Sequence, residues 1–194
     1  MITRTVDVEA CIKDILFYLG VEATDGTKDT PKRVAEWLAT FSNHHSDEEI
    51  AYILSSEFEL QGYNDLVLVK NISFAGLCEH HLLPFRGLAH VGYIPNKERV
   101  VGISKLARLV KHFSHRITMQ ERITFQIANA LEEHLQPQGC MVVMEAEHQC
   151  MTLRGVEEPH AETVTSACRG IFLENHNQCR TEFLALVKSS TGGR

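Results

Sequence analysis

Apolar residues in the first sixty positions recur at helical spacing. Over residues 6–20 they return every three or four positions, and the stretch ends at Gly20, which suits a helix C-terminus. Thr30-Pro31 is typical of a helix start because threonine can cap the first turn and proline fits its first position. A third, short helix is expected over residues 47–54. The pattern thus predicts three N-terminal helices.

The period of the pattern changes to two at about residue 66. Alternating stretches over residues 66–74 and 87–94 predict two antiparallel strands joined through residues 76–86. Helical spacing returns after Ser104 and again over residues 123–135, which predicts a helix pair. A buried run at 141–144, an alternating run at 146–153 and a final strand at 181–187 complete the predicted elements.

This order of elements predicts an α+β fold in which helices cover one face of an antiparallel sheet. No linker rich in Gly, Ser or Pro interrupts the chain. We expect residues 1–60 to form an N-terminal helical segment and residues 61–194 to form the domain that carries the sheet, the two acting as one functional unit. The edges and the other face of that sheet would then need a partner.

Charge and hydropathy exclude several classes of partner. With 19 basic and 25 acidic side chains the net charge is -6, which gives no long-range attraction to nucleic acid or to an anionic membrane. No stretch has the roughly 18 to 20 uninterrupted apolar residues of a membrane span. Residues 1–9 carry charges where a signal peptide has its apolar core, so a cytoplasmic location is expected.

The segment Cys78-Glu79-His80-His81 holds the densest group of reactive side chains. Cys78 and His81 have the C-x-x-H separation that lets a tight turn bring a thiolate and an imidazole to one zinc ion. A third ligand must come from elsewhere, and residues 145–154 offer one if they form a strand, because alternate side chains share a face. That face would carry His148, Cys150, Thr152 and Arg154.

We therefore predict a zinc site of Cys78, His81 and Cys150 with water in the fourth position. A catalytic zinc lowers the pKa of its bound water to about 7, and His80 and His148 would flank that water as proton carriers. The alternative is that the cysteines are small buried hydrophobic residues and the histidines lie on the surface, the commoner fate of each type alone. Burying so many polar groups without shared chemistry is costly, which favours the metal site.

Two further clusters are suited to an anion and to a purine. Ser104 can cap a helix whose exposed side carries Lys105 and Arg108, and the free N–H groups of a helix start favour a phosphate. An ordinary capped helix with solvated charges has the same pattern. Gln120-Glu121 places an amide beside a carboxylate, which suits the N1–H and amine of guanine. Glutamate near a helix start is also commonplace, so periodicity leaves both interpretations open.

Several motifs follow one another along residues 6–188. They are Thr30-Pro-Lys-Arg-Val, Cys78-Glu-His-His, Gly102-Ile-Ser-Lys-Leu-Ala-Arg, Gln120-Glu-Arg, His148-Gln-Cys, Arg154-Gly-Val, Thr163-Val-Thr-Ser and Arg180-Thr-Glu-Phe-Leu. Together they resemble the GTP cyclohydrolase I family, and an ordered series is more specific than any single motif. The resemblance implies that Cys78, His81 and Cys150 hold zinc and that His80 and His148 act as acid and base. It also implies a guanine anchor of Glu121 with Gln120, and a triphosphate site of Ser104, Lys105, Arg108, Arg154 and Arg33.

The same resemblance implies a reaction and an assembly. The family opens the imidazole ring of GTP at C8, releases formate and forms 7,8-dihydroneopterin triphosphate, the first step of pterin and folate biosynthesis. Its subunits have the tunnelling fold, which residues 61–194 would supply as the catalytic domain. Antiparallel sheets of several subunits close into a barrel, and two pentameric rings stack as a homodecamer. Active sites lie between subunits, so Glu121 is expected to reach a zinc held by a neighbouring chain.

Three alternatives compete with this interpretation. A relative on the same fold could act on another purine or pterin, with an altered guanine anchor or phosphate site. A non-catalytic module with a structural zinc would need a fourth ligand, which Cys140, Cys168 or Cys179 could supply. A nucleic-acid binder is disfavoured by the net charge of -6 and by the lack of a basic, aromatic-rich strand.

Overall fold

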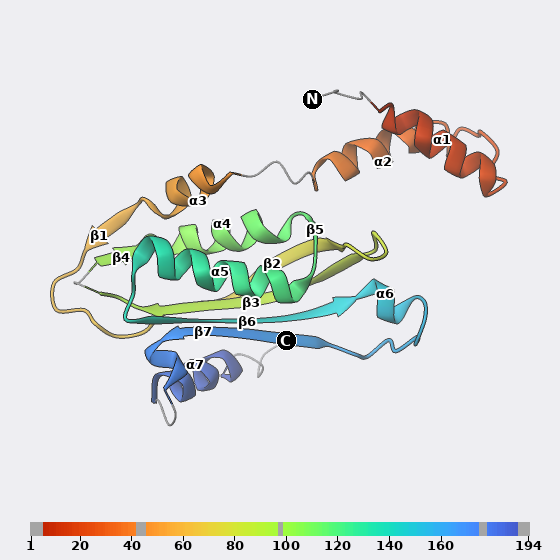
Figure 1. The fold of residues 1–194 in the computed structure, drawn as a ribbon. Coiled ribbons are helices and arrows are strands. Elements are labelled where there is room, and N and C mark those ends of the chain that lie inside the picture. The colour runs from red at the N-terminus through yellow and green to blue at the C-terminus, as the bar shows by residue number, and fades with distance from the viewer. Residues whose placement is uncertain (1–5, 42–45, 97–98, 175–177, 190–194) are drawn as a thin grey trace. The chain divides into compact units, whose positions relative to one another are not determined.

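The computed structural model describes residues 6–41, 46–96, 99–174 and 178–189 of a chain that divides into two compact units, Met1–Ser42 and Asn43–Arg194 (Figure 1). The first unit holds two predicted helices, α1 (Val8–Tyr18) and α2 (Thr30–Ala39). The Asp7 side chain caps α1 by accepting a hydrogen bond from the Ala10 N–H at 3.0 Å. Helix α2 has Asp29 as its N-cap residue, one position before the predicted Thr30.

The second unit is built on a five-stranded sheet with the order β5-β2-β3-β6-β7. All neighbours in it are antiparallel except β5 and β2, which are parallel. Strands β1 and β4 form a separate two-stranded pair. The bounds are β1 (Glu57–Glu59), β2 (Val67–Cys78), β3 (Pro84–Ile94), β4 (Arg99–Val101), β5 (Ile117–Thr118), β6 (Gly139–His148) and β7 (Thr163–Gly170).

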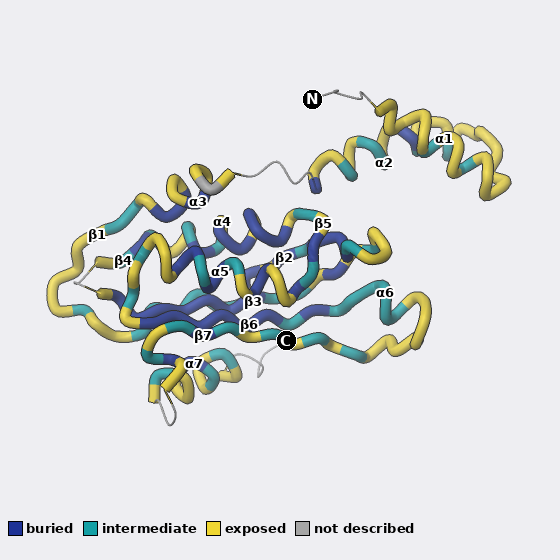
Figure 2. Tube along the Cα trace, viewed as in Figure 1, coloured by how far each residue is buried: buried dark blue, intermediate teal, exposed yellow. Residues whose placement is uncertain are grey.

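A helix pair covers one face of this sheet, as the pattern predicted (Figure 1). Helices α4 (Ile103–Ser114) and α5 (Gln120–Leu135) place their apolar stripes against strands β2, β3 and β6, and α3 (Asp47–Leu54) packs on the same core. Figure 2 shows buried residues in dark blue along α4, α5 and the strands of the sheet, and most of them form one hydrophobic core. The expected α+β class is confirmed.

Helix α7 (Gln178–Lys188) covers the other face, where a strand at 181–187 was predicted wrongly. Its Phe183 is fully buried with Phe172 and Met141. Cys179, Leu184 and Val187 join the same cluster, and positions 179, 183, 184 and 187 have helical spacing. A strand would have turned alternate members of this stripe away from the sheet. Helices on both faces also explain why residues 140–144 of β6 are buried without alternation.

The alternating run at 146–153 is a strand only as far as His148. His148 pairs with Phe85, and the partner strand β3 begins at Pro84, which has no N–H to donate. With no ladder partner left, the chain turns into the short helix α6 (Gln149–Thr152). The second hairpin is completed by β7, a strand that the pattern analysis did not predict.

The boundary between the two compact units differs from the predicted domain boundary at residue 60. Helix α3 packs with the second unit, so the compact units divide after residue 42, while the assignment of roles to residues 1–60 and 61–194 stays a prediction. Within the described residues, no helix combines the length and the apolar character needed to cross a membrane.

Candidate metal centre and active site

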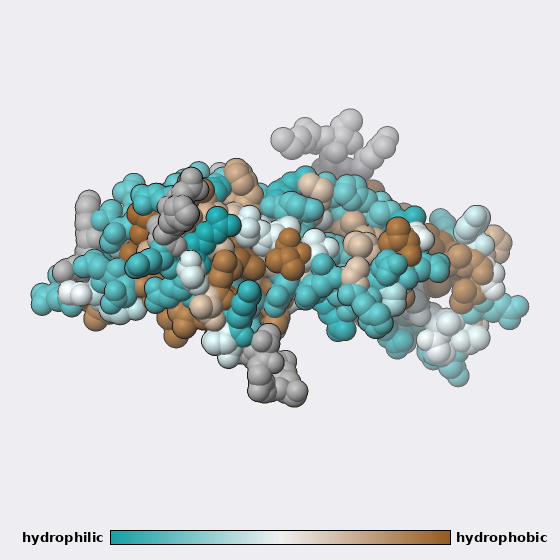
Figure 3. Space-filling model, turned by 90° about the horizontal axis from the view of Figure 1, so that it is seen from below, coloured by the Kyte–Doolittle hydropathy of each residue, from teal (hydrophilic) through white to brown (hydrophobic). Residues whose placement is uncertain are grey.

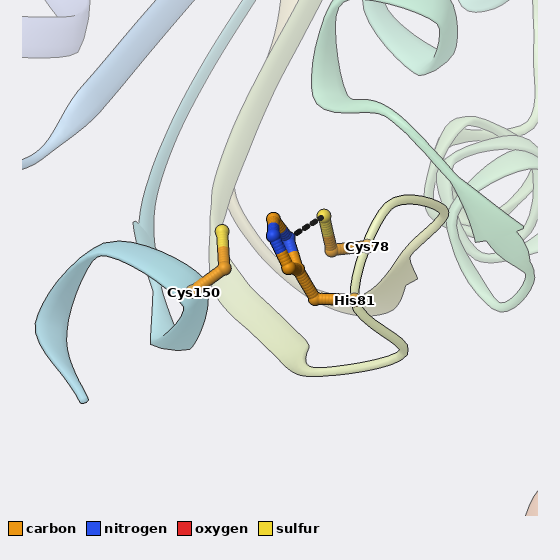
Figure 4. A group of neighbouring side chains, drawn as sticks. All are labelled: Cys78, His81 and Cys150. Carbon is orange, nitrogen blue, oxygen red and sulfur yellow. Dashed lines mark hydrogen bonds between the residues drawn. The ribbon is translucent and has the colours of Figure 1, made fainter. Parts of the chain in front are cut away.

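Cys78, His81 and Cys150 come together at one end of the sheet (Figure 4). One ligand atom from each lies within 4.8 Å of the other two, and the Cys78 Sγ is 3.8 Å from His81 Nδ1. Cys78 is buried, Cys150 is half-buried and His81 is exposed. Two thiols and one imidazole form a ligand set typical of zinc, and the exposed side leaves access for a further ligand.

A tight turn after β2 brings the first two of these side chains together. The Leu82 N–H donates to the Cys78 carbonyl at 2.8 Å, and the Cys78 N–H donates to the Leu83 carbonyl at 2.8 Å. Leu82 has a left-handed φ of 54°, which reverses the chain toward β3. The C-x-x-H spacing therefore works as the sequence predicted, through a turn at the end of a strand.

Helix α6 brings the third side chain to the same place. Cys150 lies in this single turn of helix, two residues after His148, where β6 ends. The predicted shared strand face of His148, Cys150, Thr152 and Arg154 is therefore wrong, since the last three are past the strand. Arg154 nevertheless returns to the cluster, where its guanidinium donates to His81 Nε2 at 2.6 Å.

The two sulfurs influence each other electrostatically. Burial, and then the neighbouring Cys78 sulfur, raise the pKa of the Cys150 thiol. Crowding two thiolates together is unfavourable unless a cation neutralises them. A divalent metal at this position would therefore favour the deprotonated form of both cysteines.

His148 lies beside the cluster, where two contacts hold its imidazole ring. The ring stacks on Phe85 with 4.8 Å between centroids and 2° between planes, and its Nε2 is 2.8 Å from Gln120 Oε1. Burial lowers the pKa of His148, an effect that the nearby Glu121 carboxylate opposes. His80 is exposed, with its Nδ1 3.7 Å from Cys78 Sγ. Both predicted proton carriers thus lie close to the cluster.

The first turn of α5 points three consecutive side chains in different directions. Gln120 is fully buried and contacts His148. Arg122 forms a two-pronged ion pair with Glu79 in the turn after Cys78, and this hydrogen bonding lowers the pKa of the Glu79 carboxyl. Glu121 is exposed between them, near enough to His148 to affect its pKa. An exposed carboxylate of the same chain therefore acts electrostatically on His148.

The start of α4, which carries Ser104 and Lys105 of the predicted phosphate site, lies at the opposite end of the sheet. The Val101 N–H, just before α4, donates to the Tyr93 hydroxyl at 2.8 Å, and Tyr93 pairs with Val67 at the start of β2. Cys78 ends that strand, and the 12 residues of β2 span about 36 Å. Figure 1 shows α4 beginning beside β4, at the end of the sheet away from α6. Ser104 and Lys105, in the first turn of α4, are therefore far from their own chain's cluster.

Local details of this second cluster also differ from expectation. The N-cap of α4 is Gly102, and Ser104 lies within the helix, so the predicted cap at Ser104 is wrong. The Lys105 ammonium lies 5.8 Å from the centre of the Tyr52 ring. Arg108 borders a cavity of about 1270 Å³ between α3, α4 and the sheet, and none of Cys78, His81 and Cys150 lines it.

Comparisons with known proteins show the family to which the chain belongs. The family model of GTP cyclohydrolase I matches residues 8–188. The chain belongs to the GTP cyclohydrolase I family. A GTP cyclohydrolase 1 of Bacillus mycoides is 47% identical over 187 residues, covering 94% of this chain and 96% of that protein. One of Bacillus cereus is 47% identical over 186 residues, covering 94% and 95%. The solved structure of the archaeosine synthase QueF-Like in the apo form superimposes with a TM-score of 0.44 and 17% identity, covering 55% of this chain and 94% of that one.

In a member of the GTP cyclohydrolase I family, the positions of Gln120 and Glu121 bear on how guanine is bound. Gln120 was predicted to share the guanine anchor, but it is fully buried and its amide is occupied by protein groups. Glu121 affects the pKa of His148 in its own chain, and its expected contact with a neighbour's zinc stays a prediction. The residues that lie away from this cluster are Ser104 and Lys105.

Arg33 and the cysteines outside the cluster are the remaining residues for which the sequence predicted a role. Arg33 is an exposed residue of α2, and its Nη2 lies 3.4 Å from the Asp29 carboxylate. Among the described residues, Cys78, His81 and Cys150 form the one group that could hold a metal, so Cys140, Cys168 and Cys179 supply no fourth ligand there. That disfavours a closed structural zinc site.

Proposed function

We propose that this chain is a zinc-dependent GTP cyclohydrolase I. It would open the imidazole ring of GTP, release formate and form 7,8-dihydroneopterin triphosphate. The observation that carries the proposal is the group Cys78, His81 and Cys150, whose ligand atoms lie within 4.8 Å of one another. His148 is two residues before Cys150, and the exposed Glu121 of the same chain affects its pKa. In a member of this family, that combination offers metal, proton carrier and purine anchor at one place.

The metal ligands and the histidines have distinct tasks in this proposal. Zinc bound by Cys78, His81 and Cys150 would supply an activated water for attack on C8. His148, whose pKa is lowered by burial, accepts a proton in its neutral form near that carbon. His80, exposed next to Cys78, carries protons between the ring nitrogens of the substrate and solvent.

Glu121 orients the base. Its carboxylate can accept hydrogen bonds from the N1–H and the amine of guanine together, a two-point contact that adenine does not offer. Arg122 and Glu79 tie this turn of α5 to the turn that holds Cys78 and His81. The guanine anchor and the metal ligands are therefore held in a constant relation.

The triphosphate site requires a second copy of the chain. A nucleotide is far shorter than the roughly 36 Å that β2 spans, so Ser104 and Lys105 would act at the metal centre of a neighbouring subunit, and Arg108 of the same helix would act with them. Among the described strands, the edge strand β7 pairs only with β6. Exposed apolar residues include Val164 on β7, Leu173 after it and Leu186 on α7, and Figure 3 shows hydrophobic (brown) residues at the surface. Unpaired edges and exposed apolar residues favour assembly. We propose a homo-oligomer, with the family's decamer of two pentamers as the expected form.

The remaining residues act at the same composite site in this proposal. Arg154, already beside His81, contacts the phosphates from the subunit that holds the metal, and Arg33 contributes from the N-terminal helices. Residues 61–194 would be the catalytic domain, and residues 1–60 its helical N-terminal segment. A cytoplasmic location stays the expectation from the sequence.

The function is tested by incubating purified, zinc-loaded protein with GTP. Formate release and the rise of the dihydropterin absorbance are followed together, with a parallel sample in chelator. We expect both products in equal amounts, and neither in chelator. If zinc is bound but GTP gives neither product, the chain acts on another substrate. Formate without a pterin would restrict the activity to ring opening.

Replacing Glu121 by Gln tests the guanine anchor. The amide keeps the size of the side chain but loses the charge and presents a donor to the N1–H. We expect kcat/KM for GTP to fall by about 10²-fold, since hydrogen bonds to charged groups contribute ~1.5–3 kcal/mol. Zinc content should be unchanged. The Glu133→Gln variant, an exposed glutamate near the end of α5, serves as the matched control. Unchanged kinetics in Glu121→Gln would remove this residue from guanine recognition.

A further inference from the structure

The hydrogen bonds of Gln120 determine which way its amide faces. Its Nε2 is 2.9 Å from the Met144 carbonyl, 3.0 Å from the Thr163 carbonyl and 3.1 Å from Thr165 Oγ1. Carbonyl oxygens only accept hydrogen bonds, so the amide nitrogen must be the atom that faces them. The opposite orientation would place the amide oxygen against these three oxygens, two of which can only accept, in a fully buried site.

This orientation leaves Gln120 Oε1 directed at the His148 ring. The oxygen lies 2.8 Å from His148 Nε2 and can only accept. His148 Nε2 must therefore carry a hydrogen. A neutral imidazole has one N–H, so the other nitrogen, Nδ1, holds a lone pair.

The surroundings of the ring preserve that arrangement. Phe85, itself 1% exposed, lies parallel to the imidazole and restricts tilting. A half-turn of the ring about its bond to Cβ would replace the Nε2–H by a C–H in front of Gln120 Oε1 and leave a buried acceptor unsatisfied. The amide is held in turn by β6 and β7, through the Met144 and Thr163 carbonyls.

We propose that Gln120 is a positioning residue that commits His148 to the Nε2–H tautomer, so that Nδ1 is the nitrogen available to the substrate. The part of this inference that concerns the substrate rests on the proposed function, whereas the assignment of the tautomer does not. In this proposal Gln120 does not contact guanine; it acts on the reaction indirectly, through His148. A buried amide that selects the tautomer of a catalytic imidazole has the same physical role as a carboxylate or carbonyl that orients a metal-bound histidine.

The tautomer is measured directly, without activity. Solid-state ¹⁵N NMR of zinc-loaded, ¹⁵N-histidine-labelled protein distinguishes protonated from unprotonated ring nitrogens, and the spectrum of His148→Gln assigns the signals of residue 148. We expect protonated Nε2 and unprotonated Nδ1 in the wild-type protein. The reverse tautomer in the wild-type protein overturns the proposal, whether or not the protein acts on GTP.

Kinetics of three variants test the consequence for the reaction. Gln120→Met keeps the length of the side chain but removes the acceptor, and we expect kcat to fall about 10- to 100-fold with little change in KM or zinc content. Gln120→Glu keeps an acceptor oxygen and, when protonated in this buried site, a donor, so it should recover part of the loss. Thr165→Val removes one partner of the Gln120 nitrogen and leaves the bond to His148, and it should lose less than about threefold.

The pattern of these effects separates positioning from other roles. A rise in KM with unchanged kcat in Gln120→Met would return Gln120 to substrate binding and overturn the proposal. An equal loss in Thr165→Val would mean that Gln120 supports the fold alone, which also overturns it. If Gln120→Met does not fold, the wild-type tautomer and the Gln120→Glu variant still decide the question.

Discussion

Replacing Cys150 by Ser is expected to abolish metal binding and activity together. A serine hydroxyl is a poor zinc ligand at neutral pH because it stays protonated, and Cys78 with His81 cannot hold the metal alone. The metal contributes several kcal/mol to a reaction of this kind, so turnover of GTP should fall by at least about 10³-fold. Zinc is measured by mass spectrometry after dialysis, and product formation is measured on the same sample.

A matched variant controls for the loss of a thiol. Cys179 is a half-buried cysteine of α7, outside the metal cluster, and Cys179→Ser should keep both zinc and activity. Full zinc content and full turnover in Cys150→Ser would show that the ligand set is wrong. Zinc kept with activity lost would move Cys150 from metal binding to another role.

His148→Gln is expected to keep zinc but slow the reaction strongly. Glutamine can occupy the space beside Phe85 but cannot take up a proton at neutral pH. General acid–base catalysis contributes about 10²- to 10⁴-fold, so kcat should fall within that range while KM for GTP changes little. Steady-state kinetics and metal analysis of the zinc-loaded variant measure both quantities.

The comparison variant is His134→Gln, an exposed histidine in the last turn of α5. It removes one imidazole from the surface and should leave kcat unchanged. Normal turnover in His148→Gln would exclude His148 from the proton transfers, and the tautomer selected by Gln120 would then have no catalytic consequence.

Most of the secondary structure could be predicted from periodicity. The N-terminal helices, β2, β3 and the helix pair were all predicted from the spacing of their apolar residues. In α4 and α5 this spacing corresponds to a buried stripe, whereas α1 has no buried residue. The errors fall where local pattern is ambiguous. Residues 181–187 contain a short apolar run that fits both periods, and only its packing with Phe172 and Met141 favours a helix.

The candidate site was predicted in its composition but not in its arrangement. C-x-x-H at the end of a strand is a local signal, and the structure places Cys78 and His81 as expected. Cys150 reaches them through a helical turn rather than a strand face, because pairing with β3 ends at His148. No local pattern reports where a partner strand ends.

By itself, the sequence determined the family, the α+β class and the three side chains able to hold a metal, because ordered motifs and hydrophobic period are properties of the chain alone. Only the tertiary structure decided how the predicted site residues are distributed. Gln120 is hydrogen-bonded to His148, Glu121 acts electrostatically on the same histidine, and Ser104 lies near the far end of β2. The physical reason is that hydrogen-bond partners and distances between elements depend on strand register and packing, which bring residues distant in sequence together.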